Sequence, residues 1–376
     1  MTIRILVILG TRPQIIKSAP IVHAAKTFKS MDVQIVHTGQ HCEYDMSKAF
    51  LDEMKMPNPT VDLGVGSGTH AWQTGEMMKL LEKVILKASP HYVLVPGDTN
   101  STLAGAIAAA KIKVKVAHIE AGARTYDMNL PEEVNRVLTD HCSNLLFAPT
   151  RNCLNNLRKE GIPRSRVFFR GDTHYDAFRG HIDQITTKGI LEELDTDRPF
   201  AYTTIHRAEN VDKYESLRRI VGALLGLQKL RVVFAVHPRT RERLRKWRML
   251  RRLASSANVK LLTPTTYLQS LTLAWKSSVV ITDSGGLQRE AYWLSKPCVV
   301  VREKTEWRET LDGRKCVLAP IEPATIIRKV RRAMSFDKSP EQDECVGVRS
   351  RNLLFGDGHA ARKILSDLKI HADQVL

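Results

Sequence analysis

Short apolar runs alternate with stretches of helical spacing along the whole chain, and this alternation limits the possible folds more than any other feature. In the first half the apolar runs fall at residues 3–9, 33–37, 92–96, 113–118, 144–149 and 167–170. Strands that alternate with helices in this way form βαβ units and therefore a parallel sheet. We expect a first α/β domain of about six parallel strands.

A second series of the same kind begins near residue 198. Its apolar runs fall near residues 201–205, 231–236, 259–262, 278–282, 297–301 and 316–319, without a readable sequence repeat of the first half. The economical fold is α/β, with two Rossmann-like domains that face each other across a cleft. We place the boundary where the periodicity weakens. The expected parts are residues 1–172, residues 173–354, and a C-terminal helix within residues 355–376 that packs back on the first domain.

Composition excludes several classes of protein. The length of 376 residues suits two domains, and 43% hydrophobic with 26% charged residues is typical of a globular chain. No apolar run reaches the roughly eighteen residues that a membrane span needs, and no small-residue cleavage site follows the N-terminal apolar run. We therefore expect a cytoplasmic protein with no membrane partner. The six cysteines show no C-x-x-C spacing, and Cys298 and Cys316 are expected to be reduced thiols in a core.

The net charge of +17 favours an anionic partner, and the densest basic run is Arg239 to Arg252. Within that run apolar residues recur every three positions, at Leu244, Trp247, Leu250 and Leu253. This spacing predicts one amphipathic helix with an apolar seam and a solvated basic face. Because no nucleic-acid fold signature accompanies the run, we expect no specific nucleic-acid partner.

Carboxylates gather near the ends of predicted elements in the first half. Asp98 ends one apolar run, Glu120 follows the next, and Glu132 and Glu133 lie in the first turn of a helix opened by Pro131. Because parallel strands end at the same edge of a sheet, Asp98 and Glu120 should emerge together. Asp98 alone could be only a turn or cap residue. Glu120 has no helix start to serve, and the cluster favours an acid/base site.

Two turns are suited to an anion. In the second half a strand meets a helix through Ser284, Gly285 and Gly286, where the helix N-terminus and the serine supply donors for a diphosphate. Glu290, one to two turns later, could accept hydrogen bonds from ribose hydroxyls. In the first half the turn after residues 3–9 lacks the G-x-G-x-x-G of dinucleotide folds, but Arg12 and Lys17 place two cations beside it.

Of the thirteen histidines, His206 and His237 each end a predicted strand. We select His206 for chemistry or for neutralising a leaving group. No set of His, Cys and Asp has metal-ligand spacing, so we expect a site without metal and a reaction without a cofactor.

Nine short motifs carry a resemblance to a known family. In order, they are Gly10-Thr-Arg-Pro, Thr38-Gly-Gln-His, Gly97-Asp-Thr, His118-Ile-Glu-Ala-Gly, Pro131-Glu-Glu-Val-Asn-Arg, Phe147-Ala-Pro-Thr, His206-Arg-Ala-Glu-Asn, Thr282-Asp-Ser-Gly-Gly-Leu-Gln and Gly356-Asp-Gly. Across nearly the whole chain they resemble the non-hydrolysing UDP-N-acetylglucosamine 2-epimerases. The resemblance implies a GT-B-like fold, UDP-N-acetylglucosamine and UDP as ligands, a homodimer, and inversion at C2 that gives UDP-N-acetylmannosamine for polysaccharide biosynthesis.

The resemblance also implies roles for single residues. The acid/base carboxylates would be Asp98, Glu120 and Glu132, and His206 would assist the departure of UDP. The residues that match UDP-binding positions are Arg12, Lys17, Arg136, Ser284, Gly285, Gly286 and Glu290. Those that match positions binding a second, activating substrate molecule in bacterial members are Gln40, His41, Gln73, Arg207 and His237.

Some positions depart from the usual text of the family. Gln14 stands where Glu commonly follows Arg-Pro, Arg289 replaces an acidic residue before Glu290, and Glu306-Trp-Arg-Glu309 stands for Glu-Arg-Pro-Glu. Ala123 replaces Leu and Asp172 replaces Asn. None of these changes removes a carboxylate assigned to chemistry.

Two alternatives stay open. One is a 2-epimerase for a UDP-2,3-diacetamido-glucuronate, in which the basic loop Lys304–Arg308 would neutralise the added carboxylate. The other is a GT-B glycosyltransferase. For either epimerase, the C2 proton is not acidic in the intact sugar. The available route is therefore elimination of UDP, through 2-acetamidoglucal for UDP-N-acetylglucosamine, followed by re-addition.

Overall fold

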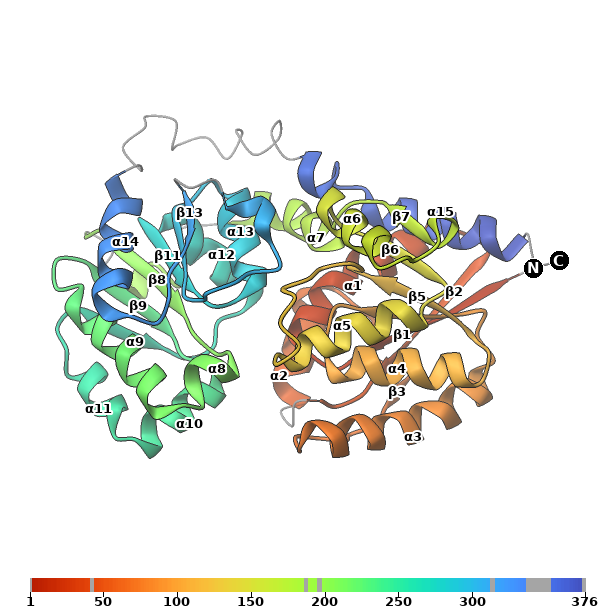
Figure 1. Ribbon diagram of the computed structural model, residues 1–376, viewed down its shortest axis with the longest axis horizontal. Helices are drawn as coiled ribbons and strands as arrows, with labels where there is room; N and C mark the ends of the chain where they lie inside the picture. The colour runs from red at the N-terminus through yellow and green to blue at the C-terminus, as the bar shows by residue number, and fades with distance from the viewer. Residues whose placement is uncertain are drawn as a thin grey trace. The chain divides into compact units, whose positions relative to one another are not determined.

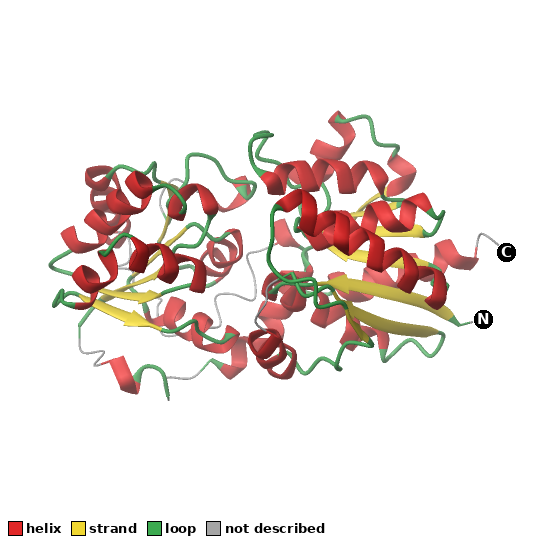
Figure 2. Cartoon of the chain, turned by 90° about the horizontal axis from the view of Figure 1, so that it is seen from below, coloured by secondary structure: helices red, strands yellow, loops and turns green. Residues whose placement is uncertain are grey.

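The structure is a computed structural model that describes residues 2–40, 44–185, 189–194, 198–311, 315–335 and 353–373. The chain divides into two compact units (Figure 1). Unit 1 comprises Met1–Gly180 and Leu353–Leu376, and unit 2 comprises His181–Asn352. In each unit helices cover both faces of a sheet whose paired strands are all parallel (Figure 2). The predicted α/β class with two Rossmann-like units is confirmed.

Unit 1 contains seven strands in the order β3-β2-β1-β4-β5-β6-β7. They are β1 (Ile3–Leu9), β2 (Met31–His37), β3 (Val61–Asp62), β4 (Tyr92–Pro96), β5 (Lys115–Ile119), β6 (Leu145–Ala148) and β7 (Val167–Phe169). The described helices are α1 (Arg12–Ala25), α2 (Tyr44–Glu53), α3 (His70–Ala88), α4 (Asn100–Lys111), α5 (Pro131–Cys142), α6 (Arg151–Lys159), α7 (Thr173–His181) and α15 (Ala360–Asp373). The strand missed in the sequence is β3, which has two residues and is too short to leave an apolar pattern.

Unit 2 contains six strands in the order β10-β9-β8-β11-β12-β13, all close to the predicted positions. They are β8 (Phe200–Thr204), β9 (Arg231–Ala235), β10 (Val259–Leu262), β11 (Val279–Thr282), β12 (Cys298–Val300) and β13 (Cys316–Leu318). The described helices are α8 (Ala208–Val211), α9 (Tyr214–Gly226), α10 (Pro238–Lys246), α11 (Met249–Ala254), α12 (Tyr267–Lys276), α13 (Gly285–Trp293) and α14 (Pro323–Ser335).

Central strands are apolar on both sides because helices cover both faces of each sheet. In β1, Leu6 and Ile8 pack in one core with residues of α3 and α4, and the alternate residues Ile5 and Val7 are equally buried. Figure 1 shows α3, α4 and α5 side by side in unit 1, in agreement with the contacts between them. Continuous burial explains why these strands appear in the sequence as unbroken apolar runs.

The prediction of one basic helix over Arg239–Arg252 is wrong. The segment forms two helices, α10 and α11, because Arg248 adopts a left-handed backbone conformation with φ +58°. The apolar seam is nevertheless real, since Leu244 and Leu253 are fully buried in the core of unit 2. The helical spacing predicted the buried face correctly, but it did not predict the break between α10 and α11 at Arg248.

The predicted core thiols Cys298 and Cys316 are confirmed as buried, reduced thiols. They are register partners on β12 and β13, and a hydrogen bond with Cys316 together with burial raises the pKa of the Cys298 thiol.

The described ranges contain neither a membrane-spanning helix nor a group of side chains suited to a metal ion. None of their helices combines the length and apolar character that crossing a bilayer requires. Three or more His, Cys, Asp or Glu side chains do not gather there closely enough to hold a metal ion.

The last helix, α15, belongs to unit 1, where it packs against α1. Its first turn is capped by a side chain from α7, because Asp176 accepts hydrogen bonds from the backbone N–H groups of Ala360 (3.1 Å) and Ala361 (2.8 Å). The crossing segments also meet directly, where the Asp172 N–H donates to Phe355 O at 2.8 Å. The boundary expected from the sequence lies at 172/173, whereas the compact unit runs to Gly180, since α7 caps α15.

The α7–α15 cap should make the stability of the protein fall as pH rises. Burial raises the pKa of Asp176 to about 6 in spite of the two N–H donors, against about 3.9 in an unfolded chain. The folded state therefore keeps the proton of Asp176 to a higher pH than the unfolded chain does. The contribution of Asp176 to stability is complete below about pH 4 and is lost as pH rises through about 6. Between about pH 4 and 7 the wild type should lose up to about 3 kcal/mol relative to Asp176→Asn, measured by urea unfolding.

Asp357→Asn provides the control of opposite sign. The hydrogen bond from Lys363, at 2.8 Å, lowers the pKa of Asp357. The stability of the wild type relative to this variant should therefore increase as pH rises. A difference between wild type and Asp176→Asn that stays constant with pH would contradict the interpretation of the cap.

Candidate active site

The carboxyl edge of the first sheet carries two of the predicted carboxylates. Asp98 follows β4, Glu120 follows β5, and these strands are adjacent with Pro96 paired to Ile119. The prediction that both residues emerge at one edge is confirmed.

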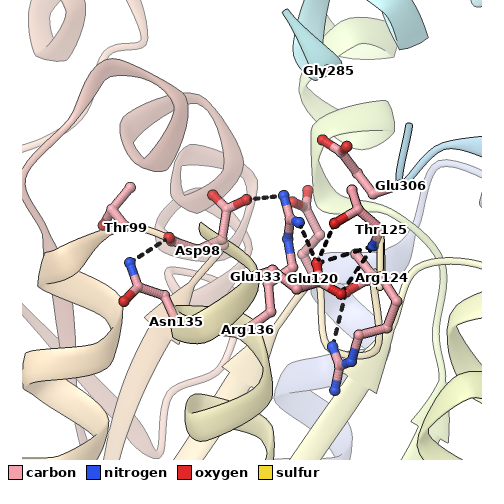
Figure 3. Close-up of polar contacts among 12 residues, drawn as sticks. Asp98, Thr99, Glu120, Arg124, Thr125, Glu133, Asn135, Arg136, Gly285 and Glu306 are labelled. Atoms are coloured by element: carbon pink, nitrogen blue, oxygen red, sulfur yellow. Dashed lines mark hydrogen bonds and ion pairs between the residues drawn. The ribbon is translucent and has the colours of Figure 1, made fainter. Parts of the chain in front are cut away.

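Asp98 is held by its neighbours on α5. Arg136 makes an ion pair with the Asp98 carboxylate, and Asn135 Nδ2 donates to the Asp98 carbonyl at 3.0 Å (Figure 3). The other end of the Arg136 guanidinium donates to Glu133 at 2.9 Å. Because Arg136 is buried between two carboxylates, it fixes the direction in which Asp98 points.

Glu120 is a buried carboxylate on strained backbone. Its φ is +71°, a left-handed conformation that a residue with a side chain rarely adopts. Its side chain forms an ion pair of 2.7 Å with Lys17 of α1, which is equally buried. A buried charge needs such a partner. The predicted diphosphate ligand Lys17 is therefore bound to a carboxylate in this structure.

The neighbouring glutamates Glu132 and Glu133 differ in their contacts. Glu132 is partly exposed and makes no hydrogen bond or ion pair with another described residue. Glu133 is buried and accepts from the N–H of Thr125 (3.0 Å), the N–H of Tyr126 (2.7 Å) and the Thr125 hydroxyl (2.9 Å), as well as from Arg136. Glu133 holds a loop in place, whereas Glu132 has a side chain available for chemistry.

The start of α1 brings two further residues into this edge. Gln14 Oε1 accepts from the Gly10 N–H at 2.9 Å, and its Nε2 donates to Pro96 O and to the Thr102 hydroxyl at 3.0 Å. An amide both accepts and donates, so glutamine suits the position where the related family commonly has Glu. Arg12, predicted to bind UDP, lies with its guanidinium 4.3 Å above the Phe50 ring.

Two residues predicted for an activating molecule lie together in unit 1. Gln73 Nε2 donates to Gln40 O at 3.0 Å, and Gln40 Oε1 accepts from the Ser101 N–H at 3.0 Å. Both side chains therefore brace the loop that follows β2. The third predicted residue of this unit, His41, lies outside the described residues.

In unit 2 the central interaction is the pair His206–Asp283. Nδ1 of His206 lies 3.1 Å from Asp283, which also accepts from the Arg207 N–H and from Asn210 Nδ2. Burial alone would raise the pKa of Asp283, but His206 and these donors outweigh it and lower the pKa to about 2. The predicted residue His237 places its ring 5.5 Å from that of His206.

The Ser-Gly-Gly turn opens α13 as predicted. The Ser284 hydroxyl caps the helix by accepting from the Leu287 N–H at 3.3 Å. A Cβ on Gly285 would lie 2.7 Å from Glu306 Oε1 and 2.8 Å from Trp307 Nε1, so this close approach requires glycine. Glu290 is buried on the same helix. The turn therefore has a capped helix N-terminus, which is suited to an anion.

Two residues that depart from the usual sequence of the family, Arg289 and Trp307, contact each other. Arg289 is buried, and its guanidinium lies 3.7 Å above the Trp307 ring. Trp307 lies on a loop that also contains Glu306. Glu306 connects this loop to the rest of unit 2 through ion pairs with Arg302 (2.7 Å) and with the predicted residue Arg207 (3.1 Å). The cation–π contact gives a buried arginine a partner.

Three buried carboxylates near these turns carry no role predicted from the sequence, namely Glu133, Asp140 and Asp283. Each is a buried carboxylate that receives several hydrogen bonds. The available signal was an acidic residue directly after an apolar strand for Asp283, and an acidic residue on the buried face of a helix for the other two. Both signals were present in the sequence.

Each sheet bears polar residues at the edge where its strands end, with carboxylates in unit 1 and a capped helix N-terminus suited to an anion in unit 2. Two Rossmann-like units with these features define a GT-B-like enzyme of nucleotide-sugar chemistry. The family model for UDP-N-acetylglucosamine 2-epimerase matches residues 23–369, so the chain belongs to that family. The resemblance noted in the sequence is confirmed.

Three comparisons extend this result. The chain is 42% identical over 370 residues to a UDP-N-acetylglucosamine 2-epimerase homolog of Methanococcus maripaludis, covering 97% of this chain and 99% of the relative. It is 40% identical over 365 residues to the UDP-2,3-diacetamido-2,3-dideoxy-D-glucuronate 2-epimerase of Pseudomonas aeruginosa, covering 96% and 98%. The crystal structure of Methanocaldococcus jannaschii UDP-GlcNAc 2-epimerase in complex with UDP-GlcNAc and UDP matches with a TM-score of 0.89 and 38% identity, covering 98% and 100%.

The contacts of the two glutamates predict effects of different size on stability for the same substitution. Glu133→Gln puts an amide NH2 where donors already point and breaks the pair with Arg136, so it should destabilise the protein by about 2 to 4 kcal/mol. Glu132→Gln, the matched control, should change the free energy of unfolding by less than about 0.5 kcal/mol. Urea unfolding measures both, and equal losses would refute the distinction.

Proposed function

We propose that this chain interconverts UDP-N-acetylglucosamine and UDP-N-acetylmannosamine as a non-hydrolysing 2-epimerase. The observation that carries the proposal is the set of carboxylates at one sheet edge of a chain that belongs to this family. Asp98 and Glu120 follow adjacent strands and are each held by a cation, while Glu132 has no described partner. Inversion at C2 requires proton removal from one face of the sugar and proton return to the other. Several carboxylates near one carbon can serve both steps.

In the proposed reaction, the bond between C1 and the UDP oxygen breaks and UDP leaves with the electron pair. A carboxylate takes the proton from C2, and a double bond forms between C1 and C2 to give 2-acetamidoglucal. A proton then adds to C2 on the opposite face while UDP returns to C1. We assign Asp98, Glu120 and Glu132 to these proton transfers.

The charge on departing UDP needs its own partners. His206 suits this role because its Nδ1 lies 3.1 Å from the buried carboxylate of Asp283, which fixes the orientation of the ring. The diphosphate and ribose would bind at the N-terminus of α13, with Ser284, Gly285, Gly286 and Glu290 as the contacts. Arg12, Lys17 and Arg136 are the proposed contacts from unit 1. For Lys17 and Arg136 this requires that they share their charge between ligand and carboxylate.

A second, activating substrate molecule and a homodimer are also part of the proposal. The activating molecule would contact the set named by resemblance, Gln40, His41, Gln73, Arg207 and His237. Gln40 and Gln73 are already hydrogen-bonded within unit 1, so they would act by holding the loop after β2.

The second candidate substrate is a UDP-2,3-diacetamido-glucuronate. It is favoured by the 40% identical relative that carries this name and by the loop Lys304–Arg308, in which Lys304 and Arg308 are exposed. Exposed cations on a loop fixed by buried Glu306 and Trp307 could pair with a carboxylate on the sugar.

Solvent deuterium tests the mechanism. With UDP-N-acetylglucosamine in deuterated water and neither NAD nor metal added, the manno epimer should carry deuterium at C2, because the returning proton comes from an exchangeable group. Proton NMR and mass spectrometry detect the label. Retention of the original hydrogen at C2 would rule out elimination and re-addition.

Substitution of the carboxylates tests the assignment of residues. Asp98→Asn, Glu120→Gln and Glu132→Gln should each lower turnover by at least about a hundredfold, as expected for loss of an acid or base. UDP should still raise the melting temperature of each variant. Glu290→Ala is the matched control, since it should weaken the UDP shift. Near-full activity in all three carboxylate variants would refute the assignment.

The two candidate sugars can be separated on one protein. If the uronate is a substrate, Lys304→Ala combined with Arg308→Ala should raise KM for the uronate by about tenfold while changing KM for UDP-N-acetylglucosamine less than about twofold. Equal effects on both sugars would exclude a carboxylate contact from this loop.

A further inference from the structure

A buried chain of hydrogen bonds joins the turn of Asp98 to the turn of Glu120. His118, on β5, is fully buried, with Nδ1 2.6 Å from Asp140 Oδ1 and Nε2 2.8 Å from Gly97 O. Gly97 directly precedes Asp98. The other oxygen of Asp140, Oδ2, accepts from the N–H of Gly122 at 3.0 Å, two residues after Glu120. The pair His118–Asp140 therefore contacts both turns at once.

The atoms in this chain define which groups donate. The Gly97 carbonyl can only accept, and Asp140 has Arg124 NH2 at 2.7 Å from Oδ2. Burial alone would raise the pKa of Asp140, but the charges and hydrogen bonds of His118 and Arg124 outweigh it and lower the pKa below its usual value. Asp140 is thus an acceptor as well. Both ring nitrogens of His118 therefore face acceptors, and the link described here requires each of them to donate.

The backbone that the pair holds is strained. Glu120 has φ +71°, and the glycines of the two turns are also left-handed, with φ +74° at Gly97 and +82° at Gly122. A left-handed residue other than glycine is strained and persists where its surroundings enforce it. Here the Gly97 N–H donates to Ile119 O at 3.0 Å, so Gly97 is fixed to β5 at both its N–H and its carbonyl.

Gly122 is fixed as firmly as Gly97. Its carbonyl accepts from Asn156 Nδ2 at 2.9 Å, and a Cβ at this position would lie 2.3 Å from Cys153 O. The Asp140 carboxylate thus completes a set of contacts on both polar groups of Gly122, and the turn can place Glu120 in only one direction.

We propose that His118 and Asp140 are positioning residues that fix the separation and direction of the Asp98 and Glu120 carboxylates. The proposal rests on the proposed function, in which these carboxylates exchange a proton with C2. It adds a cause for their placement: the link from Gly97 O through His118 and Asp140 to the Gly122 N–H. Misplacement of a reacting group by about 1 Å can lower turnover by about a hundredfold.

Nitrogen NMR of histidine-labelled protein tests the hydrogen bonds without any need for activity. In the wild type both ring nitrogens of His118 should have the shifts of N–H nitrogens. In Asp140→Asn the amide can donate to Nδ1, so one ring nitrogen should change to the shift of an acceptor. A wild-type spectrum with one unprotonated ring nitrogen would refute the proposed link.

Two substitutions of His118 separate positioning from stability. His118→Gln places an amide near Nε2 and can keep the bond to Gly97 O, whereas His118→Asn places an amide near Nδ1 and keeps only the bond to Asp140. We expect kcat per folded enzyme to be at least about tenfold lower in His118→Asn than in His118→Gln, with KM within about threefold. His118→Asn should also release more free 2-acetamidoglucal per epimer formed.

A purely structural role would give a different result. Both variants would then lose melting temperature, but kcat per folded molecule and the ratio of glycal to epimer would stay equal between them, and this result overturns the proposal. If His118→Asn does not fold, Asp140→Ala and Asp140→Asn give the same comparison, with the alanine variant expected to be the slower. A wild-type protein that forms no epimer contradicts the proposed function instead, and the nitrogen spectra then decide the present proposal.

Discussion

The reversal of strand order in each sheet is the constraint on which the candidate site depends. In unit 1 the order reverses between β1 and β4, and in unit 2 between β8 and β11. At such a point the loops that follow adjacent strands lead to helices on opposite faces, which leaves the strand ends accessible. Gly10 follows β1 in a crowded turn, because a Cβ there would lie 2.0 Å from Thr38 Oγ1. The turn after β1 is therefore crowded, and the carboxylates of Asp98 and Glu120 at this edge follow β4 and β5.

The two units place charge differently at equivalent positions. In unit 1 the carboxylates of Asp98 and Glu120 are presented at the edge, and cations from α5 and α1 support them. In unit 2 the carboxylate of Asp283 is buried below a partly exposed histidine, and its low pKa reflects the donors gathered around it. One unit therefore presents carboxylates, and the other presents a histidine and a helix N-terminus. Elimination of an anionic leaving group together with a proton needs both kinds of group.

The sequence predicted the parts of this architecture that depend on local pattern. Buried strands leave continuous apolar runs, so all strands except the two-residue β3 were located. The break at Arg248 was missed because a left-handed residue other than glycine or asparagine gives no compositional signal. Partners such as Arg136 with Asp98, or Asp140 with His118, are set by how α5 lies on the sheet, and spacing along the chain does not report that contact.

Two residues that depart from the usual sequence of the family are best interpreted together when they contact each other in the structure. Arg289 and Trp307 count as two changes in the sequence, yet the guanidinium of one stacks on the ring of the other. Either change alone would leave a buried arginine without this partner, so the two form a single physical unit. Trp307 and Glu306 also contact the Gly285 turn, while Lys304 and Arg308 on the same loop are exposed. The loop therefore joins the Gly285 turn to the surface, whereas the carboxylate edge of unit 1 keeps the residues of the family motif. A difference in the sugar that is accepted would on this basis arise in the loop of unit 2, with the proton-transfer chemistry of unit 1 unchanged.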